Sequence, residues 1–216
     1  MKLIDGSTTL LLYYVTDRTQ FAGDEPSRRR ALLGRIAEAA LCGVDFIQLR
    51  ERDLSAGELE ALARDAVRTV RENSSRTRLL INSRTDVAIA CGADGVHLRS
   101  DDVLPGEVRA AWIHSLVAMP MISVSCHSPA EVARAAAEAA DLAVFAPVFE
   151  KRGLATAGLA ALHEACEHPI KVLALGGITL ENAHGCVEAG AAGVAGIRLF
   201  QENEVAGVVR ALRDGE

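Results

Sequence analysis

Four segments of the chain share one pattern, in which small residues that end a helix lead directly into an apolar run. Gly43, Gly92 and Gly190 are suited to the left-handed conformation in which helices often stop. The segments lie roughly 50 residues apart, a spacing typical of two strand–helix units each. Four such quarters predict eight strands. The segments read CGVDFIQL, CGADGVHL, AADLAVF and AGAAGVAG.

Strand-like and helix-like runs alternate along the whole chain, without a linker or a low-complexity segment. Eight strands alternating with helices predict an α/β fold, a single (β/α)8 TIM barrel in which residues 1–216 form one domain. A doubly wound sheet would alternate in the same way, but no GxGxxG motif follows the first strand. The expected strands cover residues 11–16, 45–50, 78–82, 95–98, 121–125, 142–147, 171–176 and 194–197.

Composition excludes several classes of partner. The net charge is −6, and no basic run suggests a nucleic-acid surface. No apolar run is long enough to span a membrane, and the first residues, MKLIDGSTTL, do not resemble a signal peptide, so we expect a cytoplasmic protein. The five widely spaced cysteines indicate reduced thiols rather than disulfides or a zinc site. The sequence is compatible with a homodimer but does not locate an interface.

Polar residues stand where the expected strands end. In a (β/α)8 barrel the chemistry takes place at the C-terminal ends of the strands, so these residues are the candidates for a site. They are Asp17, Arg18, Gln48, Arg50, Arg52, Asn82, Ser83, Arg99, Asp101, Asp102, Ser125, His127, Glu150, Lys151, Arg152, Gly176, Gly177, Ile197 and Arg198.

The second strand places three of these residues on one side. Gln48, Arg50 and Arg52 are spaced two residues apart, so they face the same way, opposite the apolar Ile47 and Leu49. A guanidinium at the mouth of a barrel needs an anion to offset its lost hydration. That anion could be a substrate phosphate or carboxylate, or it could be Glu51 or Asp53.

Two further features suggest binding and proton transfer. Gly176 and Gly177 follow the seventh strand, where backbone N–H groups often bind phosphate, although close helix packing would also require glycine. His127 follows the fifth strand and could act as a general acid or base, or merely hydrogen-bond at a helix start. We expect His97, inside a strand, to be a buried histidine whose hydrogen bonds are satisfied within the core.

The strand-end motifs, in this order, resemble those of the thiamine phosphate synthase/TenI superfamily, and the resemblance covers nearly the whole chain. It implies a (β/α)8 barrel that binds a phosphorylated thiazole in thiamine biosynthesis. The matching segments are YYVTDR, GVDFIQLRER, INSRTDVA, GADGVHLRSDD, SVSCHSPAEV, FAPVF, LALGGIT and AGAAGVAGIR.

Thiamine phosphate synthases join a pyrimidine diphosphate to a thiazole phosphate and release diphosphate with the help of Mg²⁺. The resemblance implies that residues near strands 2 to 5 hold the diphosphate and the metal, and that residues after strands 7 and 8 hold the thiazole phosphate. The first set is Gln48, Arg50, Arg52, Asn82, Ser125 and, as the metal ligand, Asp102; the second is Gly176, Gly177, Ile197 and Arg198.

Several positions depart from the synthase pattern. Ser83 replaces a metal-binding Asp, Arg99 and Ser100 replace Gly-Gln, and FEKRGLATAG lacks a Thr-x-Thr-Lys loop. Mg²⁺ prefers carboxylate oxygens, and it stabilises the charge that develops on a departing diphosphate. Asp102, alone or with Asp101, would therefore hold Mg²⁺ weakly.

TenI-like thiazole tautomerases also lack the Asp after Asn and the full Thr-x-Thr-Lys loop. They aromatise a carboxylated thiazole phosphate tautomer without a metal, and a histidine after strand 5 moves the proton. The resemblance to this group assigns His127 as the acid/base and Arg50, Arg52 or Arg99 to the carboxylate. We therefore predict a tautomerase without a cofactor. The alternatives are a divergent synthase that uses Mg²⁺ and a non-catalytic protein that binds thiazole or thiamine phosphate.

Overall fold

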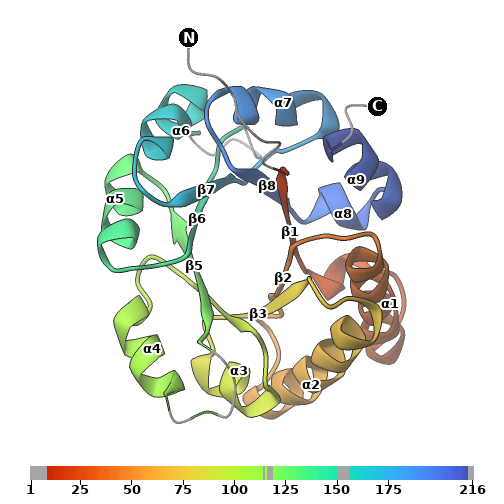
Figure 1. Cartoon of the computed structure of the whole chain (residues 1–216). Coiled ribbons are helices and arrows are strands. Elements are labelled where there is room, and N and C mark those ends of the chain that lie inside the picture. Colours follow the sequence, from red (N-terminus) through yellow and green to blue (C-terminus); the bar gives the residue numbers. More distant parts are fainter. Residues whose placement is uncertain (1–8, 114, 116–118, 150–155, 214–216) are drawn as a thin grey trace.

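A computed structural model describes residues 9–113, 115, 119–149 and 156–213. Eight parallel strands form a closed barrel in sequence order, and helices surround it (Figure 1). The predicted (β/α)8 barrel is confirmed. The strands are β1 (Leu11–Val15), β2 (Phe46–Leu49), β3 (Arg78–Asn82), β4 (Gly95–Leu98), β5 (Met121–Cys126), β6 (Leu142–Phe145), β7 (Lys171–Ala174) and β8 (Gly193–Gly196).

All eight predicted strands are present, and no end differs from the prediction by more than two residues. The largest differences are at β6 and β7, which stop before Pro147 and Gly176. Pro147 has no N–H to donate to a neighbouring strand, and Gly176 adopts a left-handed φ of 97° that a strand does not use. The candidate residues Glu150, Lys151 and Arg152 lie outside the described residues.

The helices outside the barrel include two long ones near the start of the chain and several shorter ones. Ser55 caps one of the long helices through a capping box with Glu58. The helices are α1 (Glu25–Leu41), α2 (Ala56–Asn73), α3 (Thr85–Cys91), α4 (Pro105–Trp112), α5 (Pro129–Ala137), α6 (Gly158–Cys166), α7 (Leu180–Glu188), α8 (Arg198–Gln201) and α9 (Val205–Arg213), with a 3-10 turn η1 (Arg18–Gln20).

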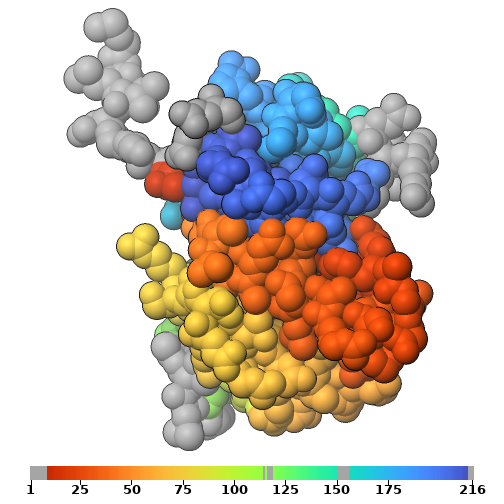
Figure 2. Space-filling model, turned by 90° about the vertical axis from the view of Figure 1, so that its right-hand side faces the viewer, coloured from red at the N-terminus to blue at the C-terminus, as the bar shows by residue number. Residues whose placement is uncertain are grey.

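The barrel closes where the two ends of the described chain meet. Strand β1 pairs with β8, and α1 lies beside α9 (Figure 2, orange-red beside dark blue). The Arg213 side chain donates a hydrogen bond to the Leu10 carbonyl, at 3.3 Å. All five cysteines are free.

The fourfold repeat has a structural cause. In each quarter, the N–H of the residue before an even-numbered strand donates to the second residue of the preceding strand. In three quarters that residue is an aspartate, whose carboxylate also accepts the N–H of the same partner. The carboxylate bonds are Asp45 to Leu12 (2.8 Å), Asp94 to Leu79 (2.8 Å) and Asp141 to Ile122 (2.7 Å). Ala192 makes only the backbone bond, to Val172.

The interior of the barrel changes from apolar to polar along its axis. Tyr13, Phe46, Leu80 and Leu173 belong to an apolar cluster enclosed by the strands. Closer to the C-terminal ends, the interior residues are polar, because alternate positions on the strands carry amide, imidazole and hydroxyl groups. These are Gln48, Asn82, His97, Ser123 and Ser125. This polar layer forms the floor of the candidate site.

Candidate functional site

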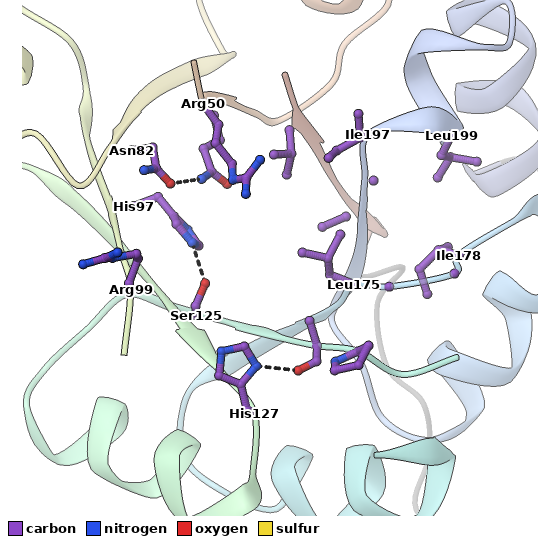
Figure 3. A pocket seen from close by; sticks show the side chains of 18 of the residues that line it. Arg50, Asn82, His97, Arg99, Ser125, His127, Leu175, Ile178, Ile197 and Leu199 are labelled. Carbon is purple, nitrogen blue, oxygen red and sulfur yellow. Dashed lines mark hydrogen bonds between the residues drawn. The ribbon is translucent and has the colours of Figure 1, made fainter. Parts of the chain in front are cut away.

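A pocket of about 480 Å³ opens at the C-terminal ends of the strands (Figure 3). It gathers every predicted substrate- and phosphate-binding residue and the predicted acid/base. They are Gln48, Arg50, Arg52, Asn82, Arg99, Ser125, His127, Gly176, Gly177, Ile197 and Arg198. The predicted metal ligand, Asp102, and Ser83 are not among the residues that line the pocket.

Arg50 projects from the end of β2 into the pocket (Figure 3). Burial and the neighbouring charge of Arg52 lower the pKa of Arg50 from its ordinary value, although the group remains a cation. Among the described residues, neither arginine has an ion-pair partner. The two carboxylates that could have neutralised Arg50, Glu51 and Asp53, are bound by Arg18 at 3.1 and 2.7 Å.

Arg18 is therefore structural. It is 4% exposed, and its guanidinium binds Glu51, Asp53 and Glu25. The sequence left open whether Arg50 pairs with its neighbours or with a ligand. Because Arg18 takes both neighbours, Arg50 presents its charge to the pocket.

The wall formed by β3 and the end of β4 carries a chain of hydrogen bonds. Gln48 Nε2 donates to Asn82 Oδ1 (2.8 Å), and Asn82 Nδ2 donates to Ser83 Oγ (3.2 Å). Ser83, whose φ of 57° lies in the left-handed region, donates its hydroxyl to Asp102 Oδ2 at 2.6 Å. The same oxygen accepts the Arg99 N–H (2.8 Å), and Oδ1 accepts from Arg99 Nε (3.3 Å).

These donors determine the charge of Asp102. Burial alone would raise its pKa, but the Ser83 hydroxyl, the Arg99 N–H and the Arg99 guanidinium outweigh burial, and the pKa is lowered. Both carboxylate oxygens of Asp102 are thus occupied by donors. Asp101 is exposed and pairs with the same guanidinium at 3.3 Å.

The loop after β7 offers backbone N–H groups. Among the described residues, the N–H groups of Gly176 and Gly177 have no acceptor. Gly177 (φ 66°) is held by Asn182 of α7, which donates to its carbonyl at 2.8 Å. Gly176 must be glycine for a packing reason as well, because a Cβ there would lie 2.7 Å from Pro147 Cα.

His127 stands just beyond β5, across the pocket from Arg50 in Figure 3. The backbone N–H of His127 donates to Glu131 Oε2 at 2.7 Å. The ring Nδ1 lies 2.7 Å from the Ala146 carbonyl oxygen. A carbonyl oxygen only accepts, so Nδ1 carries a proton. In the neutral ring, Nε2 is therefore unprotonated.

His97 is buried, as expected, but it also lines the pocket. Its Nε2 lies 2.8 Å from Ser125 Oγ, and its Nδ1 contacts Ser123 Oγ and the Tyr13 hydroxyl. Tyr13 and Ser123 lie beneath the pocket and do not line it, and neither was singled out from the sequence. The alternation of Ser123 with Ser125 on β5 was the one sequence signal that could have suggested Ser123.

Fold and pocket together define a (β/α)8 barrel protein with an arginine-lined pocket for a small molecule at the C-terminal ends of its strands. A sequence model of the thiamine monophosphate synthase family matches residues 12–200. The chain therefore belongs to this family, within the thiamine phosphate synthase/TenI superfamily that its motifs indicate.

Individual relatives agree with this assignment. A putative thiamine-phosphate synthase of Geobacter sulfurreducens is 41% identical over 191 residues, covering 85% of this chain and 83% of the relative. A thiamine-phosphate synthase of Methanoculleus marisnigri is 38% identical over 211 residues, covering 94% and 93%. A solved thiamine phosphate pyrophosphorylase from Pyrococcus furiosus has a TM-score of 0.77 at 25% identity, covering 95% and 98%.

Within the described ranges, every helix is too short or too polar to cross a lipid bilayer.

Proposed function

We propose that this chain is a TenI-like thiazole tautomerase that acts on a carboxylated thiazole phosphate. The observation that carries the proposal is the orientation of His127. Because Nδ1–H is held by the Ala146 carbonyl at 2.7 Å, the neutral ring keeps the lone pair of Nε2 available. A base in this state can take a proton from a carbon atom of the substrate and return a proton to another position.

The pocket supports this reaction by its charge. The guanidinium of Arg50 and the N–H groups of Gly176 and Gly177, close to the start of α7, have no partner among the described residues. The guanidinium suits the substrate carboxylate, and the N–H groups suit the phosphate. Two anionic groups bound at separate places would fix the ring between them. This would keep the reacting carbon within reach of a single base.

The residues around Asp102 do not fit a magnesium ion. The two oxygens of the carboxylate already accept from Ser83 and Arg99, and Ser83 uses its hydroxyl proton for the bond to Asp102. No group of three His, Cys, Asp or Glu side chains suited to a metal occurs in the described part of the chain. We therefore derive no step through a metal.

The second candidate, a thiamine phosphate synthase, is favoured by the names of the relatives. Two assays separate it from the tautomerase. We expect purified protein to aromatise the thiazole carboxylate phosphate tautomer in the presence of EDTA. Magnesium-dependent formation of thiamine phosphate at an ordinary enzymatic rate would instead establish the synthase. Tight binding of the thiazole phosphate with neither activity would indicate a binding protein.

His127→Ala should lower kcat of the tautomerase by about 100-fold or more, the usual scale for loss of a general acid/base. His163→Ala is a matched control, because the His163 Nδ1 also bonds to a backbone carbonyl, that of Ala189, but lies on α6 away from the pocket. The control should retain wild-type kcat. Equal rates for wild type and the His127 variant would remove His127 from the mechanism.

A further inference from the structure

Three polar side chains meet inside the barrel beneath the pocket, and proton transfer by His127 does not involve them. Tyr13 comes from β1, His97 from β4 and Ser123 from β5; they are 0%, 4% and 0% exposed. The Tyr13 hydroxyl lies 3.0 Å from Ser123 Oγ and 3.2 Å from His97 Nδ1, and Ser123 Oγ lies 2.8 Å from that same Nδ1. We call these three groups the buried triangle.

The charge states of the buried triangle follow from its burial. Desolvation raises the pKa of Tyr13 far above its ordinary value, so the phenol keeps its proton. Desolvation, helped by the nearby charge of Arg50, lowers the pKa of His97 to about 3. At neutral pH the triangle thus contains a phenol, an alcohol and an uncharged imidazole.

Counting protons selects one tautomer of His97. If Nδ1 carried the ring proton, the triangle would hold three protons and only two oxygen acceptors. Only one proton can lie between the two oxygens, so one buried N–H or O–H would have no acceptor. If Nδ1 is bare, Tyr13 and Ser123 both find acceptors, one donating to the other oxygen and the other to Nδ1. A buried unsatisfied donor is costly, so the ring proton belongs on Nε2.

The position of this proton determines the role of Ser125. His97 Nε2–H donates to Ser125 Oγ at 2.8 Å (Figure 3). Among the described residues, Ser125 Oγ has no other hydrogen-bond partner, and the side chain lines the pocket. Because its oxygen accepts from His97, its own proton remains available for an acceptor in the pocket.

We infer that His97 is a positioning residue that presents Ser125 as a hydrogen-bond donor to an anionic oxygen of the substrate. Ser125 lies two residues before His127 on the same side of the barrel, so its donor is aimed near the reacting part of the ligand. When His127 removes a proton from carbon, negative charge develops on the substrate. A preorganised O–H donor would stabilise that charge. The tautomer of His97 and the donor role of Ser125 follow from the geometry, whereas the step that this donor assists rests on the proposed function.

The tautomer can be measured without any reaction. Ring ¹⁵N chemical shifts distinguish the two neutral tautomers and the imidazolium, and His97→Gln identifies the resonances of His97 by their loss. We expect the Nε2–H form of His97, unchanged between about pH 5 and pH 9, the range in which an ordinary histidine titrates. An Nδ1–H form, or protonation within this range, would overturn the inference.

Kinetics test whether His97 acts through Ser125. His97→Leu should lower kcat/KM by about 10- to 100-fold, the range expected for a lost hydrogen bond to a charged group. His97→Gln can place an amide N–H near the position of Nε2–H and should recover most of this loss. In the Ser125→Ala background, His97→Leu should have no further effect. If the two substitutions instead lowered kcat/KM by factors that multiply, His97 would act independently of Ser125, in a structural role, and the positioning role would be contradicted.

Tyr13→Phe is the control for general damage to the core. It leaves Ser123 to donate to Nδ1, so the tautomer and kcat/KM should stay near wild type. Thermal unfolding shows whether each variant is folded. If His97→Leu does not fold, the cycle is run with His97→Gln and His97→Asn. The amide of asparagine is too short to reach Ser125.

A second readout separates this inference from the proposed function. Calorimetric binding of the aromatic thiazole carboxylate phosphate should weaken by the same factor in Ser125→Ala and His97→Leu. Wild-type protein without tautomerase activity would remove the proposed function and leave this comparison intact. Unchanged binding in both variants would overturn the inference.

Discussion

At the scale of single residues, the pocket is defined by charges whose natural partners are engaged elsewhere. Arg50 is next in sequence to Glu51, yet Glu51 turns away and accepts from Thr16 and Arg18. Asp102 shows the opposite case, because its carboxylate accepts from Ser83 and Arg99 and does not line the pocket. Among the described residues, the pocket thus has an unpaired cation, Arg50, beside a carboxylate that is already hydrogen-bonded, and this combination favours anions.

The first residue-scale prediction concerns Arg50. Arg50→Ala should raise KM by about 10- to 100-fold, because a charge-assisted hydrogen bond to the substrate carboxylate is lost, while Arg50→Lys should lose less. Arg52→Ala is the comparison, and its exposed side chain predicts a smaller change. The measurement is steady-state kinetics with the carboxylated substrate. An unchanged KM in Arg50→Ala would place the carboxylate elsewhere.

At the scale of elements, the aspartates of the repeat hold neighbouring strands in register. Each carboxylate accepts a backbone N–H of the preceding strand and also meets an arginine. These pairs are Asp45 with Arg213 (2.6 Å), Asp94 with Arg78 (3.2 Å) and Asp141 with Arg109 (3.0 Å). They lie at the end of the barrel opposite the pocket, so they serve stability rather than chemistry.

Asp94→Ala should therefore destabilise the fold without changing the site. The N–H of Leu79 loses its partly buried acceptor, so we expect a loss of about 1–3 kcal/mol in the free energy of unfolding. Asp65→Ala removes an exposed carboxylate paired with Arg68 on α2 and should cost less than about 1 kcal/mol. Denaturant unfolding measures both free energies. Equal losses would show that the hydrogen bond between Asp94 and Leu79 adds no more stability than an exposed ion pair.

At the scale of the whole molecule, charge is distributed unevenly. The chain has a net charge of −6, yet four of its described arginines line one pocket: Arg50, Arg52, Arg99 and Arg198. A local cationic site in an acidic protein attracts anionic ligands over short distances only, because salt screens fields beyond about 10 Å at 0.1 M ionic strength.

Affinity for the doubly anionic substrate should fall as ionic strength rises through about 0.1 M. Arg52 is exposed and unpaired among the described residues, so Arg52→Ala should reduce the slope of log KM against log salt. Titrating NaCl in the kinetic assay measures this slope for both proteins. A KM independent of salt would mean that the arginines do not contact charged parts of the substrate.

Contacts set by a single strand could be predicted from the sequence, whereas contacts between segments far apart along the chain could not. Period-2 alternation on β2 and β5 was sufficient to bring Gln48, Arg50 and Ser125 to one pocket, since a strand dictates its own faces. The buried triangle was not foreseen, because β1 and β4 meet only across the closed barrel. The ion pair between Arg18 and Glu51 could not be predicted either, since it depends on the path of the chain after β1.

The closure of the barrel by β1 and β8 has a consequence for the order of the chain. Since Arg213 reaches the carbonyl of Leu10, the two ends of the described chain are spatial neighbours. The sheet pairing and the pocket depend on which strands are adjacent, and not on which strand comes first. A circularly permuted chain, joined near these ends and opened at the Gly43 turn on the far side from the pocket, would keep every strand partner it now has.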